Sequence, residues 1–323
     1  MFSYRHAFHA GNHADVLKHV TLIATLRHLM RKDGALMLID THAGAGIYRL
    51  DDEAARTSGE ALAGIARLRA LAGPVDLASN KAVAPASQAL AAINGVADAL
   101  ADYLGVVASF NRASAAGADW RVYPGSPLIM HALMVEPRRA AVHDRLKLFE
   151  LHPADAMALA AHVAQLQAGR QVSAARQDGF VALRALLPPP AAAGGPRRAL
   201  ALIDPSYEIK SDYAKVAAAV QDALERFATG VYLVWYPIIA RPEAHALPRR
   251  LQTLARQARR PWLHATLRTG VAPGARAAGL TASGMFVINA PHTLKAALDA
   301  ALPQALHALA AGRGQGWSVE CGG

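Results

Sequence analysis

The sequence predicts an α/β fold built around a doubly wound parallel sheet, and two observations support this prediction. Short apolar runs at 36–40, 146–150, 199–204 and 230–237 have the length of buried strands, and helical segments flank each of them. This alternation is typical of parallel sheets covered by helices on both faces. In addition, 53% of the 323 residues are apolar and only 18% are charged, which suits a full hydrophobic core rather than a disordered chain.

The first predicted strand, 36–40, is followed by a glycine-containing turn that we expect to lead into a helix. Residues 51–118 are rich in Ala and Leu and weakly helical, so we interpret them as a helical insertion subdomain. The main domain then comprises 1–50 and 119–323. Within it, the Pro- and Gly-rich run 187–198 is predicted to be a loop.

The last part of the main domain contains two further strand-like runs, 262–268 and 284–291. A Gly- and Ala-rich loop separates them, with no clear helical segment in between. Because a short connection joins neighbouring strands in antiparallel fashion, we expect these two runs to pair at the edge of the sheet.

Composition also limits the class of protein. Cys321 is the single cysteine, which excludes a disulfide framework and a Cys-rich metal site and fits a reducing compartment. Basic and imidazole groups fill the first residues in place of an apolar signal segment, and no run of about 18 uninterrupted apolar residues occurs. We therefore expect a soluble, cytoplasmic protein.

The net charge of +10 is unevenly distributed. Residues 241–276 contain eight arginines and one acid, Glu243. Arginine matches phosphate groups with two parallel hydrogen bonds, so this segment favours a nucleic-acid partner. A solvated arginine-rich helix face, common in Ala- and Arg-rich sequences, is the alternative interpretation.

The turn after the first strand reads Asp40-Thr41-His42-Ala43-Gly44-Ala45-Gly46. Glycines directly after a strand allow the backbone to approach a bound nucleotide closely. The dinucleotide fingerprint G-x-G-x-x-G is not completed, because Arg49 stands where its third glycine would be. The turn therefore favours a nucleotide-containing ligand other than NAD or FAD, although a simple left-handed turn would have the same sequence.

Two further acidic positions follow candidate strands. Glu150 ends the second strand, where doubly wound folds place an acid that binds ribose hydroxyl groups, although a solvated strand-end acid is the alternative. Asp178, in the sequence Asp178-Gly179-Phe180, is a similar polar break where an adenine ring would bind.

The segment Asp204-Pro205-Ser206-Tyr207 follows an apolar strand and resembles the (D/N)-P-P-(Y/F) motif of S-adenosylmethionine-dependent amino-methyltransferases. The Asp204 carboxylate and the Pro205 carbonyl are suitable acceptors for the hydrogens of an adenine N6 amino group. The Tyr207 ring offers a surface on which an extruded base stacks. Ser206 replaces the second proline of the motif, which loosens the turn.

Eight ordered blocks together resemble the bacterial 23S ribosomal RNA adenine-N6 methyltransferase family. The resemblance implies a class I methyltransferase, Rossmann-like fold with a small helical insertion, S-adenosyl-L-methionine as cofactor, protein-free 23S rRNA as substrate, and a monomer. The blocks are SYRHAFHAGNHADVLKH (3–19), DTHAGAG (40–46), YPGSP (123–127), ELHP (150–153), DGF (178–180), DPSYE (204–208), RFATGVYLVWYP (226–237) and TASGMFVIN (281–289).

The same resemblance assigns roles to individual residues. Asp204 becomes the catalytic hydrogen-bond acceptor, and Tyr4 contacts the substrate base. With the two glycines of the first turn and Asp204 included, the cofactor pocket comprises His19, His42, Gly44, Gly46, Ser126, Glu150, Asp178, Gly179 and Asp204.

Two other functions remain open at this stage. The N-terminal cluster His6, His9, His13, Asp15 and His19 has spacings that permit a metal site, as in a metal-dependent hydrolase; local hydrogen bonding of these histidines is the alternative. A non-catalytic RNA-binding protein with a decayed site is the other possibility, which Ser206 favours and the retained Asp204 and Tyr207 oppose.

Overall fold

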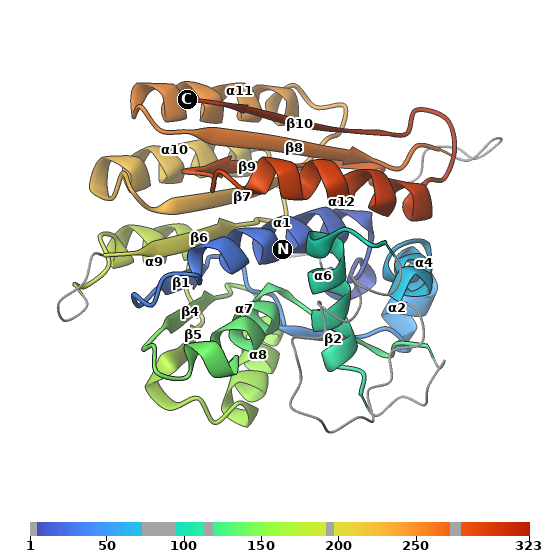
Figure 1. Cartoon of the computed structure of the whole chain (residues 1–323), viewed down its shortest axis with the longest axis horizontal. Helices are drawn as coiled ribbons and strands as arrows, with labels where there is room; N and C mark the ends of the chain where they lie inside the picture. The colour runs from blue at the N-terminus through green and yellow to red at the C-terminus, as the bar shows by residue number, and fades with distance from the viewer. Residues whose placement is uncertain (1–4, 73–94, 113–118, 192–196, 272–278) are drawn as a thin grey trace.

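The computed structural model describes residues 5–72, 95–112, 119–191, 197–271 and 279–323. Its centre is an eight-stranded sheet with strand order β10-β8-β9-β7-β6-β1-β4-β5 (Figure 1). The strands β4 and β6 pair with β1 on its opposite sides. The sheet is therefore doubly wound, as the sequence predicts, and the order of strands reverses at β1.

Five neighbouring strands of the sheet run in parallel: β1 (Met37–Asp40), β4 (Arg145–Phe149), β5 (Val172–Ala175), β6 (Ala199–Ile203) and β7 (Val231–Pro237). Four of them are the predicted strands at 36–40, 146–150, 199–204 and 230–237, and β5 is not among these predicted runs. Because all five have the same direction, their carboxyl ends meet at one edge of the sheet, where ligands bind in this type of fold.

The remaining strands are antiparallel. β9 (Ala282–Ile288) lies between β7 and β8 (Trp262–Arg268), and β10 (Gly316–Gly322) pairs with the outer side of β8. The expected antiparallel pairing of 262–268 with the later run is confirmed. Its expected place at the sheet edge is wrong, because β10 occupies that edge. The half-exposed sequence of β10 lacks a clear apolar alternation, and the prediction missed it.

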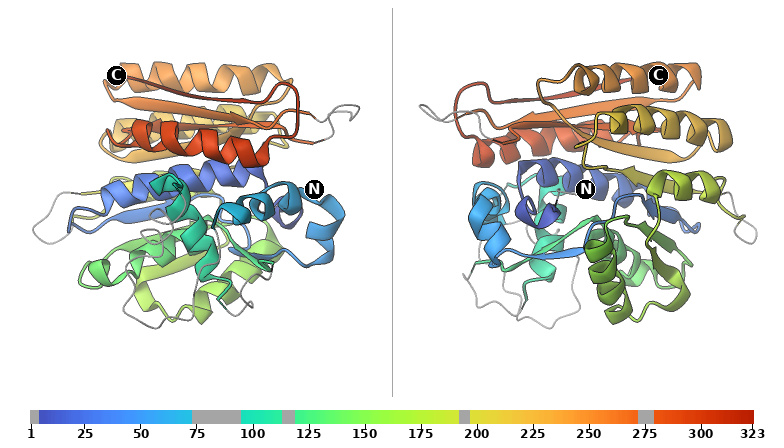
Figure 2. Two further views of the ribbon diagram at one scale, coloured as in Figure 1. Left: turned by 45° about the vertical axis from the view of Figure 1, so that its right-hand side comes forward. Right: turned by 180° about the vertical axis from the view of Figure 1, so that it is seen from behind.

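Helices cover both faces of the sheet (Figures 1 and 2). Apolar side chains alternate along the strands: Leu38 packs toward one face and its neighbour Ile39 toward the other. The first face is covered by α1 (His13–Leu29), α6 (Asp98–Ser109), α7 (Ser126–Met134), α8 (Pro153–Gln165) and α12 (Leu294–Leu309). The second face is covered by α9 (Gly179–Leu186), α10 (Ser211–Arg226) and α11 (Pro242–Gln257).

The glycine turn after β1 does not lead into a helix, so that expectation is wrong. Instead, β2 (Ile47–Arg49) follows and pairs with β3 (Val122–Pro124) in a separate two-stranded sheet. Tyr48 explains the difference: its ring is buried, and its hydroxyl accepts a hydrogen bond from the Ala45 amide, which fixes the turn against the core. The turn amides are thus offered by a loop rather than by a helix terminus.

Within 51–118, the structure contains short helices followed by α6, which agrees with a helical character. Buried residues of α4 and α6 belong to the same hydrophobic core as α1 and α12. Residues 73–94 and 113–118 lie outside the described residues, and the boundaries of the insertion stay a prediction. The short elements here and elsewhere are α2 (Glu53–Ser58), α3 (Glu60–Ala63), α4 (Ile65–Arg69), η1 (His6–Phe8), η2 (Ala70–Ala72), η3 (Pro137–Arg139) and η4 (Gly169–Gln171).

Across the described ranges, no helix combines the length and the apolar character that crossing a membrane requires.

Asp40 ends β1 in a fully buried position at the reversal of strand order. Ser126, the first residue of α7, donates a hydrogen bond of 2.6 Å to its Oδ2 atom. Burial raises the pKa of Asp40 from 3.8 to about 7, because the protein interior solvates a carboxylate poorly, and the Ser126 hydrogen bond opposes this effect only in part. The strand end beneath the first loop therefore carries a carboxyl group that titrates near neutral pH.

We expect Asp40→Asn to change how stability depends on pH. A raised pKa in the folded state means that the stability contributed by neutral Asp40 is complete below pH 3.8 and is lost as the pH rises toward 7. The wild type should therefore lose stability relative to Asp40→Asn across this interval, by at most about 1.4 kcal/mol per pH unit. Urea unfolding of both proteins at several pH values measures this; parallel stability curves would contradict it.

Candidate functional site

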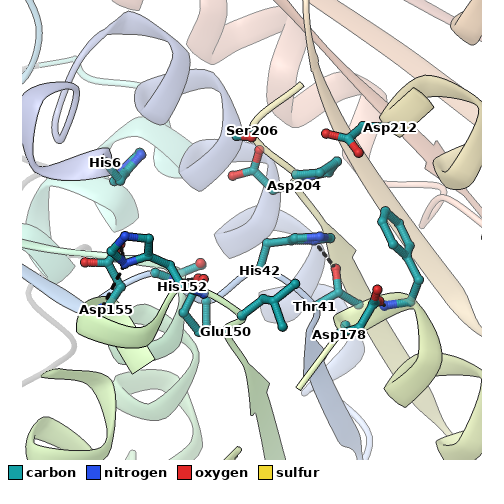
Figure 3. A pocket seen from close by; sticks show the side chains of 18 of the residues that line it. His6, Thr41, His42, Glu150, His152, Asp155, Asp178, Asp204, Ser206 and Asp212 are labelled. Carbon is teal, nitrogen blue, oxygen red and sulfur yellow. Dashed lines mark hydrogen bonds and ion pairs between the residues drawn. The ribbon is translucent and has the colours of Figure 1, made fainter. Parts of the chain in front are cut away.

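Two adjoining cavities lie at the carboxyl edge of the parallel strands. The first is bounded by the loops after β1, β4, β5 and β6, and Figure 3 shows side chains from all four loops around it. The second lies between η1, the start of α1, and the ends of β6 and β7. His6, Lys18, Asp204 and Ser206 line both cavities, so the loop after β6 separates them.

The first wall of the cavity is the loop after β1 together with Glu150. The Gly44 amide donates to Glu150 Oε2 (2.8 Å), and the His152 amide donates to Oε1 (2.7 Å). Gly44 adopts φ of 60°, and a Cβ atom there would lie 2.2 Å from the Tyr48 hydroxyl, so only glycine fits. Burial raises the pKa of Glu150, and its two backbone hydrogen bonds oppose this. The carboxylate is fixed in place with its exposed side toward the cavity.

The opposite wall is formed by the start of α9 and by His42. Asp178 caps α9 by accepting hydrogen bonds from the Phe180 and Val181 amides through one oxygen, Oδ1. Gly179 is required because a Cβ atom would lie 1.9 Å from the Thr41 carbonyl oxygen. His42 packs edge-on against Phe180, and burial lowers the pKa of His42 to about 4, so its ring is neutral near pH 7.

Asp204 lies at the junction of the two cavities, where the loop after β6 begins (Figure 3). Its Oδ2 atom accepts a hydrogen bond of 2.7 Å from the Lys18 ammonium group, which also contacts Asp15 Oδ1 at 2.9 Å. The two carboxylates raise the pKa of Lys18 well above its usual range, and they outweigh the effect of burial. Asp15 also accepts from His6 and from the Gly11 amide. The negative charge of Asp204 is thus held by a compensated buried network.

Tyr207 lies within this loop and has a backbone conformation that is unusual for tyrosine. Its φ of 55° lies in the left-handed region, and its hydroxyl donates to the Trp235 carbonyl (2.6 Å). The guanidinium of Arg241 donates to the Tyr207 carbonyl (3.2 Å). The ring packs 4.6 Å from that of Tyr213 and lines the second cavity with only 2% of the residue exposed.

Most of the predicted site residues lie around the first cavity. His42, Gly44, Ser126, Glu150, Asp178, Gly179, Asp204 and Pro205 line it. Tyr207 lines the second cavity instead. Gly46 packs against Leu128 and Leu159, and His19 is fully buried with Nδ1 2.8 Å from the Tyr123 hydroxyl. Tyr4 lies outside the described residues. Burial lowers the pKa of His19 to about 3, which makes it a neutral core residue.

Sequence reasoning missed the role of Lys18 and identified His6 and Asp15 only as candidate metal ligands. The spacing of Asp15 and Lys18 gave part of the signal for an ion pair, because side chains three positions apart lie on the same face of a helix. Their link to Asp204 across 186 positions is visible only in the fold.

The N-terminal histidines do not form a metal centre in the part of the chain that is described, where no group of three or more His, Cys, Asp or Glu side chains is placed to hold an ion. His6 instead contacts Asp15 (3.0 Å), and His9 contacts Glu60 (3.0 Å). The carboxylate of Glu60 raises the pKa of His9. These contacts favour local hydrogen bonding over the metal-dependent hydrolase.

Known proteins resemble this chain over nearly its whole length. The protein of Escherichia coli (strain K12) named ribosomal RNA large subunit methyltransferase J is 40% identical over 303 residues, which cover 94% of this chain and 92% of that protein. The protein of the same name from Haemophilus influenzae is 35% identical and covers 99% and 98% of the two chains. A crystal structure of a protein from Legionella pneumophila superposes with a TM-score of 0.72 at 28% identity, over 97% and 98%.

The family model described as "Ribosomal RNA large subunit methyltransferase D, RlmJ" matches residues 33–84 and 72–321. The two relatives, the strand order and the cavity bounded by loops all agree with this match. The chain belongs to the RlmJ family of ribosomal RNA large subunit methyltransferases.

Proposed function

We propose that this methyltransferase transfers a methyl group from S-adenosyl-L-methionine to the exocyclic N6 atom of an adenine in protein-free 23S rRNA. The observation that supports this most directly is the position of Asp204, whose carboxylate lies where a cofactor cavity and a second cavity meet. A methyl donor in one cavity and an amino group in the other would face each other across this residue.

The residues of the first cavity fit the proposed cofactor. Glu150 presents a fixed carboxylate suited to ribose hydroxyl groups, and Asp178 has its Oδ2 atom left over from capping α9. Gly44 and Gly179 carry no side chains that would obstruct a close approach. The bound sulfonium compound would supply an activated methyl group, so the protein's own task is to align the acceptor.

The loop after β6 supplies the hydrogen-bond acceptors for the amino group. The Asp204 carboxylate and the Pro205 carbonyl would accept the two N6 hydrogens, which frees the nitrogen electron pair for attack on the methyl carbon. The Lys18 ammonium group contacts Asp204 at 2.7 Å and would hold this carboxylate in position to accept the N6 hydrogens. The nitrogen would lose a proton only after methylation has made it positively charged.

The second cavity would hold the extruded base. Tyr207 and Trp235 provide aromatic walls, and stacking on Tyr207 would stabilise the base. Because only 2% of Tyr207 is exposed, stacking requires neighbouring side chains to uncover its ring. The role of Tyr4 in contacting the base stays part of the same proposal.

The arginine-rich segment 241–276 supports RNA as the partner, and we propose that the enzyme acts as a cytoplasmic monomer. A non-catalytic RNA-binding protein would also use this charge. The intact Asp204–Lys18 pair beside the cavity favours turnover, since a decayed site has no need to hold a buried carboxylate there.

We expect Glu150→Gln to weaken S-adenosyl-L-methionine binding by about tenfold or more, because the amide loses the charged acceptor for the ribose hydroxyls. Isothermal titration calorimetry measures this change. Glu225→Gln, on the exposed face of α10, is the matched control and should bind like the wild type. Equal affinities of all three proteins would refute the ribose assignment.

We expect Asp204→Asn to reduce methyl transfer by at least about a hundredfold and to leave cofactor affinity within about tenfold, because it removes a transition-state acceptor. Labelled methyl transfer to protein-free 23S rRNA, followed by nucleoside analysis, measures the rate and identifies N6-methyladenosine. Asp222→Asn, whose carboxylate pairs with Arg226 on α10, serves as control. Near-normal methyl transfer by Asp204→Asn would rule out the catalytic role of Asp204. If the wild type bound RNA but transferred no labelled methyl group, a non-catalytic RNA-binding protein would be favoured.

A further inference from the structure

Arg241 differs in its surroundings from the other described arginines of the segment 241–276. It follows β7 and precedes the first residue of α11, and it is the member of that segment that lines the second cavity. Its residue is partly buried, whereas Arg249, Arg256 and Arg259 are exposed. Its position at the wall of a cavity indicates a more specific role than a contribution to the general surface charge.

The guanidinium of Arg241 is only partly used by the protein. In the ranges that the structure describes, its side chain makes one hydrogen bond, from Nη1 to the Tyr207 carbonyl, and no ion pair. A guanidinium has five N–H donors in a planar arrangement. Four donors thus remain for a ligand, while the single bond fixes the group beside the catalytic loop.

The other charged side chains around the second cavity contact one another. Lys18 contacts both Asp15 and Asp204, at distances of 2.9 and 2.7 Å. Glu60 accepts hydrogen bonds from Asn12 and contacts His9. Arg241 is therefore the cation on this wall, among the described residues, that no carboxylate neutralises. Such a group attracts an anion, and a phosphate matches the two parallel donors of a guanidinium.

We propose that Arg241 binds the backbone phosphate of the RNA nucleotide whose base enters the second cavity. The same guanidinium donates a hydrogen bond to the Tyr207 carbonyl. It would therefore connect the bound RNA phosphate to the loop that carries Asp204. This inference rests on the proposed function, in which the second cavity receives the base. It assigns to Arg241 a role in positioning the substrate. Neither the charge of the segment 241–276 nor its sequence distinguishes Arg241 from the other arginines in this respect.

The test compares how the affinity for protein-free 23S rRNA depends on salt. Each phosphate contact contributes about 0.7–0.9 to the slope of log affinity against log salt concentration. Arg241→Gln should lower the slope by that amount and raise KM for RNA. It should also lower kcat, because the Tyr207 carbonyl loses its hydrogen bond from the guanidinium. Arg145→Gln is the control: it removes the same charge from an exposed residue at the start of β4, at the opposite edge of the sheet.

A second variant separates the two contacts of the guanidinium. Arg241→Lys keeps the positive charge, so its salt slope should match that of the wild type. A single ammonium group cannot reproduce the planar fork that reaches both the phosphate and the Tyr207 carbonyl, so kcat should stay below that of the wild type. Full recovery of kcat with lysine would overturn the link to the catalytic loop.

Other outcomes also decide the proposal. An unchanged slope in Arg241→Gln would overturn the phosphate contact even if kcat fell, and an equal loss of slope in Arg145→Gln would show only general charge attraction. Failure of the proposed function is recognised separately, because wild-type protein would then give no N6-methyladenosine. The salt slopes of the three proteins would still show whether Arg241 contacts a phosphate.

Discussion

The site depends on one buried interaction, the contact of the Lys18 ammonium group with Asp15 and Asp204. Removing a charge from water is costly, and here the costs of three charged groups offset one another only when all three are in place. The contact joins the N-terminal half of α1 to the loop after β6, and Lys18 and Asp204 are 186 positions apart. Because His6 and the Gly11 amide also bind Asp15, the N-terminal segment and the loop after β6 form one unit.

This unit lies at the point where the strand order reverses. At β1 the chain places β4 on one side and β6 on the other, so the loops that follow these strands diverge and leave space between them. Glu150 and Asp204 stand on the two sides of that space. The geometry therefore follows from the topology of the sheet, and the individual residues determine which ligand the space accepts.

Much of this was predictable because the carboxyl ends of parallel strands meet at one edge. Glu150 and Asp204 each stand at the end of an apolar run, so their common location could be inferred from local sequence. The Lys18–Asp204 pair could not, since no local pattern reports a contact across 186 positions. The helix expected after Gly46 failed for a similar reason: pairing with β3 and burial of Tyr48 outweighed the local signal of the glycines.

The position of α1 has a consequence for the order in which the molecule is made. This helix emerges from the ribosome early, yet it packs against β9 and α12, and His28 contacts Thr293, 265 positions later. The part of the apolar surface of α1 that β9 and α12 cover therefore becomes buried only when nearly the whole chain has been synthesised. Since Lys18 belongs to this helix, the element that carries the partner of Asp204 reaches its final packing only at the end of translation.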